Sequence, residues 1–358
     1  RTRDSLAEEI EATLGRHGDD EELAAKALRA LRRKELLRLA MGSMLGVSDT
    51  TATAGGLSDL AAEHVGGLVA LAVKGVPGIS FSVIGMGRLG GREIGFSSDL
   101  DVLYVFRDEG AGDQATTLAN QVVKDVKRLG EDVLFPLELD AGLRPEGKNG
   151  PMVRSLEAYE QYYQRWALGW EAQALLRAAP FAGEETVAQE FLEMAIPFRY
   201  PSGFSPEQAR EIRRIKARVE SERLPQGADS SRHLKLGRGS LSDVEWAIQL
   251  LQLTHGHDYP DIRTPSTLDA LRALTGHDLI SADDAQQLEE AWTLASSVRT
   301  ALALYGAKSS DVLPDDRAGL EGAARLMGYG PLSASALEER YLRVTRRSRV
   351  VFERLFYG

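Results

Sequence analysis

Apolar residues recur at three- and four-residue spacing over most of this chain, which is the period of an amphipathic α-helix. The stretch EELAAKALRALRRKELLRLAMGSML, residues 21–45, repeats this pattern in an alanine- and leucine-rich composition and predicts a long helix. A second helix is predicted over residues 57–74. Six more helical stretches follow Gly142, with turn residues between them: 156–179, 206–224, 240–256, 264–276, 281–306 and 335–356. Strand signals stop at Gly142, so the rest of the chain is predicted to be a helical bundle.

The strand signals are short apolar runs bounded by glycine and proline. ISFSVIG (residues 79–85) and LDVLYVF (100–106) predict two strands, and DVLFPLELD (132–140) predicts a third whose Pro136 favours an edge position or a bulge. Residues 114–130 predict a helix between the last two. The predicted fold class is α+β: connector helices (1–75), a small mixed-sheet domain (76–155) and a helical bundle (156–358).

Composition narrows the classes of partner. The 358 residues include 43 basic and 53 acidic ones, for a net charge of -10, so a nucleic-acid partner is not expected. The chain has no cysteine and hence no disulfide or thiolate metal site. We find no signal-peptide core and no apolar run long enough to span a bilayer, so no membrane partner and a cytoplasmic location are expected. The opening RTRDSLAEEI lacks an initiator methionine and suggests a longer parent protein, whereas VVFERLFYG resembles a natural terminus.

The stretch FSVIGMGRLGGREIGFSSDLDVLYVF, residues 81–106, contains a G-x-G-x-x-G pattern at Gly85, Gly87 and Gly90. A dinucleotide-binding fold needs a full helix after the third glycine and an acidic residue at the end of the next strand. Here Gly91 and Gly95 leave room for little helix, and the acidic residues stand at the start of the next strand. No G-K-[ST] follows, so a Walker A loop is excluded as well.

Asp99 and Asp101 are two residues apart on a predicted strand, so their side chains point to the same face. Two carboxylates 4 Å apart repel by roughly 4 kcal/mol at an effective dielectric of 20, and such a pair favours a cation between its members. Magnesium suits carboxylate and phosphate oxygens. The alternative is a helix cap or a solvated strand end, but the glycine turn and the flanking strands favour the metal site.

The same stretch supplies candidate phosphate ligands. The glycines allow close approach of the backbone to phosphate, and a cation and two hydroxyls lie nearby; the predicted set is Gly87, Arg88, Gly90, Gly91, Ser97 and Ser98. A third carboxylate is expected on a neighbouring strand, and we choose Asp140 over Glu138, which lies deeper in the strand. Arg144 and Lys148 are the nearby cations for phosphate, with solvated loop charges as the alternative.

These residues resemble a nucleotidyltransferase of the DNA polymerase β superfamily. GMGRLGGREIGFSSDLD, LDAGLRPEGKNGPMV, YYQRWALGWEAQALLRA and KLGRGSLSDVEWAIQLLQL are similar, in order, to motifs of the bifunctional glutamine synthetase adenylyltransferase family. The resemblance implies that Asp99, Asp101 and Asp140 hold Mg²⁺, that ATP is the substrate and that glutamine synthetase is the target. It also implies a PII-type signal protein and glutamine as possible regulators.

Family members have two such units in tandem: the N-terminal one removes AMP by phosphorolysis, and the C-terminal one attaches it. The ending FERLFYG and the leading helix favour the C-terminal unit. Two departures stand out, Gly142 where the family often has arginine and Gly239-Ser240 where many members have two glycines. The role of residues 235–245 stays open between a substrate-facing site and a helix start capped by Ser240 or Ser242. Rival functions are the AMP-removing unit, a non-catalytic glutamine- or PII-sensing module and, more distantly, a Rossmann oxidoreductase.

Overall fold

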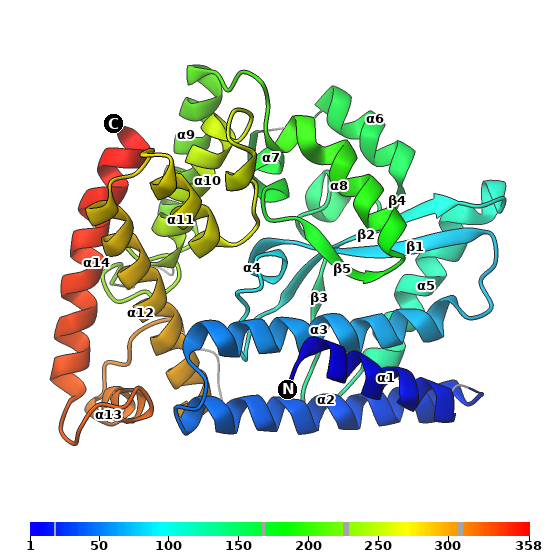
Figure 1. Cartoon of the computed structure of the whole chain (residues 1–358), viewed down its shortest axis with the longest axis horizontal. Coiled ribbons are helices and arrows are strands. Elements are labelled where there is room, and N and C mark those ends of the chain that lie inside the picture. The colour runs from blue at the N-terminus through cyan, green and yellow to red at the C-terminus, as the bar shows by residue number, and fades with distance from the viewer. Residues whose placement is uncertain (18, 167–168, 225–228, 307–310) are drawn as a thin grey trace. The chain divides into compact units, whose positions relative to one another are not determined.

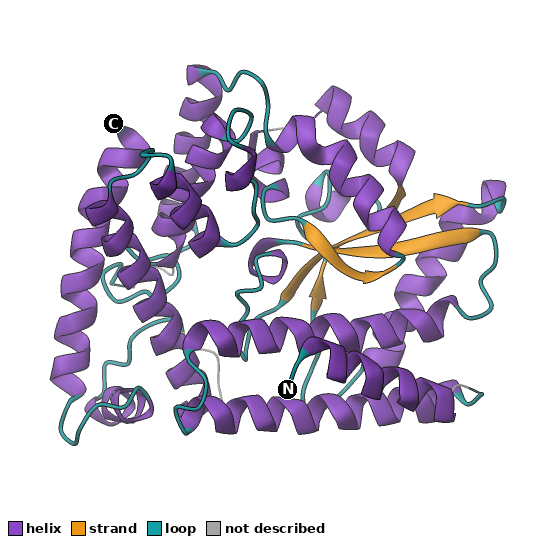
Figure 2. Cartoon of the chain, viewed as in Figure 1, coloured by secondary structure: helices purple, strands orange, loops and turns teal. Residues whose placement is uncertain are grey.

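The computed structural model describes residues 1–17, 19–166, 169–224, 229–306 and 311–358, which fold into two compact units. The first unit contains a small sheet with helices around it, and the second is built of helices (Figures 1 and 2). The first unit comprises Arg1–Leu39, Ala54–Ile94 and Ser98–Phe198, and the second comprises Ala40–Thr53, Gly95–Ser97 and Arg199–Gly358.

The elements follow one another along the chain with short connections. Those up to the end of the first unit are α1 (Arg3–His17), α2 (Glu21–Met44), α3 (Thr50–Val73), β1 (Ile79–Gly85), α4 (Gly87–Gly90), β2 (Leu100–Asp108), α5 (Ala115–Gly130), β3 (Leu139–Asp140), β4 (Val153–Ser155), α6 (Leu156–Trp166), α7 (Gly169–Leu175), β5 (Ala179–Gly183) and α8 (Glu185–Arg199). Those of the second unit are α9 (Pro206–Glu222), α10 (Leu241–His255), α11 (Thr267–Gly276), α12 (Ala282–Gly306), α13 (Arg317–Leu326) and α14 (Ala334–Tyr357).

The five-stranded sheet has the order β3-β2-β1-β5, and β4 pairs with β2 as well. β1 lies antiparallel to both β2 and β5, whereas β3 and β4 run parallel to β2. The register places Leu100 opposite Leu139 and Asp101 opposite Asp140. β3 therefore ends beside the first residues of β2, at the end of the sheet where the predicted metal site lies.

Side chains on the two faces of the sheet enter separate apolar layers. Leu103 and Val105 of β2 pack into a buried cluster that also contains Ile84, Met86, Tyr159, Tyr163, Leu175, Ala178, Val187, Ala188 and Phe191. The helices that supply this layer include α6 and α8, which lie above the sheet in Figure 1, while α3 lies below it. Because alternate residues of a strand share a face, Asp101 points to the same side as Leu103 and Val105.

In the second unit, α12 packs against α10, α13 and α14. The shared core is apolar and includes the fully buried Trp292, Leu337 and Tyr341. Several of the unit's described helices begin with a side-chain cap; for example, Ser205 forms a capping box with Gln208 at α9, and Asp316 accepts the Gly319 N–H at α13. Apolar periodicity and caps together explain why this part of the chain is helical.

The predicted fold class is confirmed, as are the strands at residues 79–85 and 100–106 and the helices at 21–45, 57–74 and 114–130. The third strand was predicted too long: only Leu139–Asp140 is extended, because Asp132 Oδ1 accepts the N–H groups of Leu134 and Phe135 and bends the chain into a turn. The statement that strand signals stop at Gly142 was wrong, since β4 and β5 complete the sheet after it.

All six helical stretches predicted after Gly142 contain helices, although the first is divided into α6 and α7, with residues 167 and 168 outside the described part of the chain. Three helices were not predicted, α1, α8 and α13. One expectation about apolar runs needs correction: α3 is long and apolar enough to cross a membrane, with a mean hydropathy of 1.3 in its most apolar window. That window is 67% buried inside the protein, as in a core helix.

Gly90 supplies a test of how tightly this fold holds the glycine turn. A Cβ at this position would lie 1.8 Å from the carbonyl oxygen of Arg177 and 2.7 Å from that of Gly85. We therefore expect Gly90→Ala to lower the free energy of unfolding by more than about 2 kcal/mol, as measured by denaturant titration. Gly66→Ala in α3 is the control, because nothing lies within 4 Å of its Cβ; it should stabilise the protein by about 0.5–1 kcal/mol. Equal effects at both positions would contradict this account.

Candidate active site

The three predicted carboxylates lie together at the start of β2. Asp101 and Asp140 face each other across paired strands, and Asp99 comes two residues before Asp101. Each contributes an oxygen atom, and these atoms all lie within 4.8 Å of one another. Asp99 and Asp140 are exposed and Asp101 is half-buried. The structure thus brings together all three residues that the sequence analysis selected, and leaves them open to solvent.

The oxygen set fits a hard divalent cation. Magnesium binds oxygen at about 2.0–2.1 Å, so ligands on opposite sides of one ion lie about 4 Å apart, and paired ions in two-metal sites lie about 3.5–4 Å apart. Carboxylate oxygens spread over 4.8 Å need only a small adjustment to reach one ion or two. Burial raises the pKa of the Tyr104 phenol in β2, and the negative charge of Asp140 raises it further. The electrostatic effect of the site therefore reaches a residue inside the sheet.

The glycine turn rests directly on this carboxylate cluster. Met86 N–H donates to the Asp101 carbonyl at 2.8 Å, and the chain then forms the single turn of α4. Gly87 has φ +51°, and a Cβ here would lie 2.3 Å from Asp101 Oδ2. Glycine suits this position, because a side chain would strain the left-handed backbone and displace the Asp101 carboxylate. The sequence pattern was therefore correctly placed beside the acidic pair, and its short helix excludes a dinucleotide fold.

The other predicted phosphate ligands lie around this turn or just before β2. Gly91 N–H donates to the Gly87 carbonyl at 3.3 Å, which closes the turn. Arg88 is half-buried, and its Nε donates to the Glu93 carbonyl at 2.8 Å. Ser98 is half-buried, whereas Ser97 is exposed and belongs to the three-residue segment grouped with the second unit. Their contacts with phosphate remain predictions.

The loop after Asp140 is organised by Arg144. This side chain is only 8% exposed and donates to three carbonyl oxygens, those of Gly150 (3.1 Å), Ala141 (2.8 Å) and Lys148 (3.0 Å). The observed contribution of Arg144 is thus to the shape of the loop, while Lys148 is an exposed cation within it. Contact of either residue with phosphate remains a prediction.

Gly142, at the position where the family often has arginine, contacts the third carboxylate. Gly142 N–H donates to Asp140 Oδ1 at 2.8 Å, and a Cβ at this position would lie 3.0 Å from the same oxygen. The glycine backbone therefore orients the third carboxylate directly. A larger residue here would need the Asp140 side chain to move by a few tenths of an ångström.

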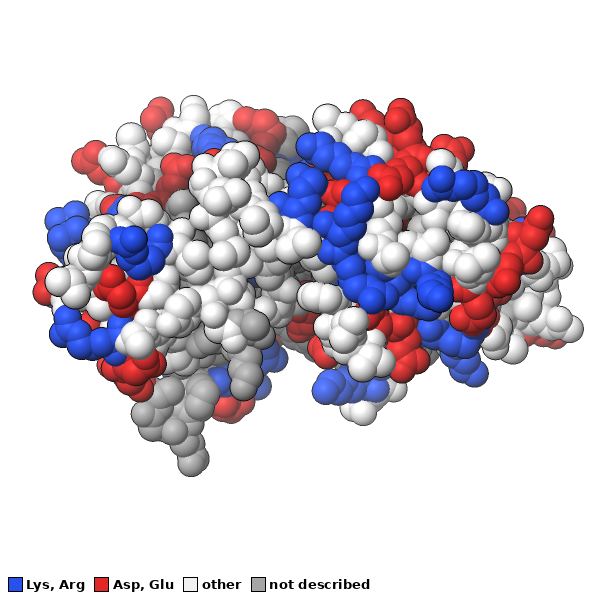
Figure 3. Space-filling view, turned by 90° about the horizontal axis from the view of Figure 1, so that it is seen from below, with Lys and Arg blue, Asp and Glu red and all other residues white. Residues whose placement is uncertain are grey.

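The loop before Asp140 is fixed by arginines of α2, a contribution that the sequence analysis missed. Lys and Arg side chains gather in a band on the face of the molecule that carries α2 (Figure 3). Arg29 donates to the Leu129 carbonyl, Arg32 donates to the Phe135 and Pro136 carbonyls, and Arg33 pairs with Asp132 at 3.1 Å. These basic residues therefore act within the protein, by holding the segment that leads into β3.

Two charged residues of the site were not foreseen at all. Glu93 and Arg177 are 5% and 4% exposed and form an ion pair, and Arg177 Nε donates to the Gly87 carbonyl at 3.0 Å. The sequence does contain a signal for both residues. Glu93 in REIG and Arg177 in ALLRAAP have apolar neighbours, a pattern that favours burial of the charged side chain. Buried charges of this kind need partners.

Comparison with known proteins is consistent with this geometry. Residues 1–194, more than half of the chain, match the family described as glutamate-ammonia ligase adenylyltransferase. The chain belongs to this family. Residues 212–356 match a second family, described as GlnD PII-uridylyltransferase.

Curated relatives carry the name bifunctional glutamine synthetase adenylyltransferase/adenylyl-removing enzyme. The protein from Leifsonia xyli is 52% identical over 362 residues, and the alignment covers 100% of this chain and 36% of that protein. The protein from Streptomyces avermitilis is 45% identical (100% and 38%), and that from Nocardia farcinica is 44% identical (94% and 35%). The chain thus spans just over a third of the length of these relatives, and the resemblance predicted from its motifs is confirmed.

Within the part of the chain matched to the second family, residues 239–244 form a buried junction of the second unit, while Lys235 and Arg238 of the same segment are exposed. Asp243 is 1% exposed; its carboxylate pairs with Lys216 at 2.7 Å and Arg349 at 2.9 Å, and accepts the Gly239 N–H at 2.6 Å. Burial alone would lower the pKa of Arg349, but the carboxylates of Asp243, Glu353 and Glu220 outweigh this and raise it.

The turn before α10 is also explained. Gly239 has φ +70°, and a Cβ there would lie 1.8 Å from the Thr345 carbonyl oxygen, so glycine is required. Ser240 has a negative φ and needs no glycine, which accounts for the departure from the two-glycine pattern. The predicted cap was wrong, because Ser240 Oγ donates to the Leu234 carbonyl and Ser242 Oγ accepts from Lys216 at 3.1 Å.

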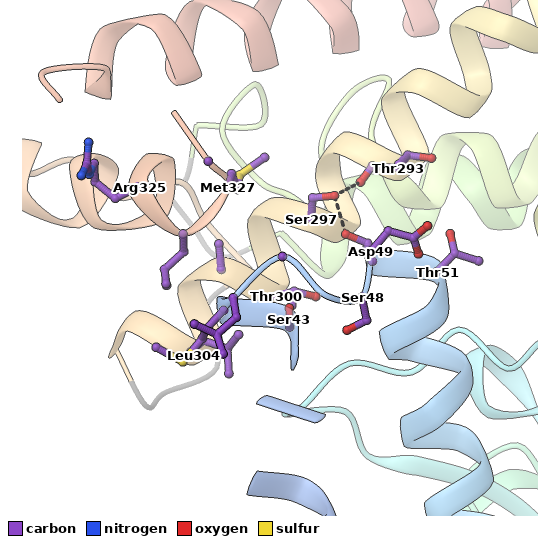
Figure 4. A pocket seen from close by; sticks show the side chains of 17 residues that line it. Ser43, Ser48, Asp49, Thr51, Thr293, Ser297, Thr300, Leu304, Arg325 and Met327 are labelled. Carbon is purple, nitrogen blue, oxygen red and sulfur yellow. Dashed lines mark hydrogen bonds between the residues drawn. The ribbon is translucent and has the colours of Figure 1, made fainter. Parts of the chain in front are cut away.

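The second unit also contains a hollow of about 530 Å³ between the segment 43–51, α12 and the end of α13 (Figure 4). Its wall is rich in hydroxyls, but these bond within the wall: Thr50 Oγ1 lies 2.7 Å from Ser297 Oγ, which donates to the Thr293 carbonyl. Its single carboxylate, Asp49, accepts the Ala52 N–H and so caps α3. Among the described residues, the group of acids that could hold a cation is that of Asp99, Asp101 and Asp140.

The repulsion among the three carboxylates generates a first prediction for this site. In the presence of a chelator, Asp99→Asn should raise the unfolding temperature by a few degrees, because it relieves about 1 kcal/mol of repulsion at high effective dielectric. The same variant should lose most of the stabilisation that Mn²⁺ or Mg²⁺ gives the unmodified protein. Asp113→Asn, an exposed acid of the same unit, is the control and should change neither value. Metal stabilisation that survives in Asp99→Asn would contradict the assignment.

For the buried junction around Asp243, we expect a substitution to lower stability and to leave metal binding unchanged. Lys216→Met leaves Asp243 with one cation fewer in a buried position, and should lower the free energy of unfolding by about 3 kcal/mol without changing Mn²⁺ affinity. Arg218→Met, an exposed residue on the same helix, should stay within about 0.5 kcal/mol of the unmodified protein. Calorimetry and a Mn²⁺ titration measure the two quantities. Unchanged stability with weakened Mn²⁺ binding would restore the substrate-facing interpretation.

Proposed function

We propose that this chain transfers AMP from ATP to a tyrosine of glutamine synthetase and releases pyrophosphate. The observation that carries the proposal is the convergence of three carboxylates beside a glycine turn in which an added Cβ at Gly87 would collide with one of them. This combination supplies the cation ligands and the close backbone approach that a nucleoside triphosphate requires. The match to an adenylyltransferase family over residues 1–194 covers the same site.

In this proposal Asp99, Asp101 and Asp140 hold Mg²⁺, which neutralises phosphate charge when bound. Gly87, Gly90 and Gly91 let the backbone approach the phosphates, with Arg88, Ser97, Ser98, Arg144 and Lys148 as further candidate ligands. Asp140 receives the proton of the tyrosine hydroxyl, and the Gly142 N–H holds its other oxygen in place. The tyrosine oxygen forms a bond to the α-phosphorus, the bond to the bridging oxygen of the β-phosphate breaks, and pyrophosphate leaves. Catalysis then rests on positioning and electrostatics.

The wider context is part of the same proposal. It includes a cytoplasmic location and regulation by glutamine or a PII-type signal protein, and PII appears in the description of the family matched by residues 212–356. The AMP-attaching direction is supported by the description of the family matched by residues 1–194, which names the adenylyltransferase activity. The phosphate-dependent removal of AMP uses the same metal chemistry and is the second candidate, because the relatives' names include both activities.

The test is an assay pair on the whole chain. With ATP, Mg²⁺ and glutamine synthetase, we expect an added AMP on a tyrosine, seen by mass spectrometry, and a loss of about 100-fold or more in Asp101→Asn. Asp113→Asn should keep full activity. With AMP-modified glutamine synthetase and phosphate, release of ADP would identify the removing activity instead. Activity that persists in Asp101→Asn would refute the metal site, and no activity in either assay would support a non-catalytic module.

A further inference from the structure

The pair formed by Glu93 and Arg177 lies behind the glycine turn and out of reach of a nucleotide. Both residues are buried, at 5% and 4% exposure, and the guanidinium bonds the carboxylate directly. A guanidinium enclosed in this way cannot serve as a phosphate ligand on the surface of the site. Any effect on the chemistry must therefore pass through the residues that it contacts.

Those contacts bracket the turn at both ends. Arg177 Nε donates to the Gly87 carbonyl at 3.0 Å, and the same side chain pairs with Glu93. Glu93 in turn closes the turn through its main chain: its N–H donates to the Arg88 carbonyl at 2.8 Å, and its carbonyl accepts from Arg88 Nε at 2.8 Å. The main chain of Arg177 adds a steric wall, since its carbonyl oxygen lies against Gly90. One buried arginine thus contacts the turn at Gly87, just after β1, and at Glu93, where the turn closes.

The next contact in the series is the metal site itself. Gly87 lies so close to Asp101 that a single added carbon would sit 2.3 Å from Oδ2. A shift of Gly87 toward the carboxylate would displace Asp101, and a shift away would remove the wall that limits its rotation. Contacts that orient a metal ligand contribute to metal affinity even where they do not reach the ion. The position of Gly87 therefore bears directly on the metal affinity of Asp101.

Stability does not account for such a pair. The attraction within a buried ion pair roughly offsets the free energy needed to remove its two charges from water. Apolar residues of similar volume therefore often replace such a pair without loss of stability. What apolar residues cannot supply is the N–H group that holds the Gly87 carbonyl. Lysine cannot replace the arginine either, since one ammonium does not reproduce the planar fork that bonds a carboxylate and a carbonyl together.

We propose that Arg177 and Glu93 are positioning residues that set the geometry of the glycine turn against Asp101, and thereby the affinity of the site for its divalent cation and nucleotide. The inference rests on the proposed function, because it assumes that Asp99, Asp101 and Asp140 bind a metal. It assigns no contact with substrate to either residue.

The test uses three variants of the whole chain and one control. Arg177→Met with Glu93→Met removes the charges together and keeps the buried volume, so it should fold with an unfolding temperature near that of the unmodified protein. Glu93→Gln keeps the shape of the side chain and lowers only the charge, and Arg177→Lys keeps the charge and loses the fork. Glu35→Gln is the matched control: Glu35 is 2% exposed and pairs with Arg1 and Arg38 elsewhere in the same unit.

The readout is Mn²⁺ binding followed by electron paramagnetic resonance, without nucleotide, on protein whose fold is checked by circular dichroism. We expect the Kd for Mn²⁺ to rise about tenfold or more in the double variant and in Arg177→Lys, about threefold or more in Glu93→Gln, and not at all in Glu35→Gln. In the activity assay, the KM for ATP should rise more than kcat falls.

The outcomes separate the two levels of the proposal. If the unmodified protein binds Mn²⁺ and the folded variants bind it equally well, the positioning role is overturned and the proposed function stands. If the unmodified protein binds no Mn²⁺, the metal site and this inference are overturned together. Should the double variant fail to fold, Glu93→Gln and Arg177→Lys decide the matter by the same comparison.

Discussion

The structure of the first unit depends on one electrostatic constraint, which is that three carboxylates converge at one end of its sheet. The register of β2 with β3 sets Asp101 beside Asp140, and the alternation along β2 brings Asp99 to the same end of the sheet. The nearby Arg144 bonds carbonyl groups of its own loop, and Arg177 bonds the Gly87 carbonyl and pairs with Glu93. Leaving like charges together is unfavourable in the metal-free protein. A cation-binding role gives that arrangement a physical reason.

The surrounding elements hold the carboxylates in place through backbone contacts. β3 is only two residues long, so pairing with β2 alone fixes little of the chain around Asp140. Arginines of α2 hold the loop before it, and Arg144 holds the loop after it. On the other side, the glycine turn presses against Asp101 and is held by Arg177. These arginine side chains thus bond mainly to the main chain, and the carboxylates form the part of the site that solvent reaches.

Local patterns in the sequence predicted much of this arrangement. The spacing of Asp99 and Asp101 and the preceding glycines identified the site, because both depend only on residues close in sequence. The pattern failed where distant contacts decide. Residues 132–138 have a strand-like composition, yet Asp132 bends them into a turn whose carbonyls bond to α2. β4 and β5 are three and five residues long, too short to show a periodicity, and become strands by pairing with β2 and β1.

Contacts between residues distant in sequence also decide which charged residues are buried, and the sequence patterns did not predict these. From sequence alone, the role of residues 235–245, which include Asp243, stayed open between a substrate-facing site and a helix start, whereas Glu93 and Arg177 drew no attention. In the structure, Asp243 is surrounded by Lys216, Arg349 and a backbone N–H, so its charge is fully compensated inside the second unit. The contrast distinguishes two uses of acidic residues next to glycine. A carboxylate that is buried among cations stabilises the turn that it contacts, while a cluster of partly exposed carboxylates is accessible to a cation. Burial, which sequence spacing does not report, separates the two.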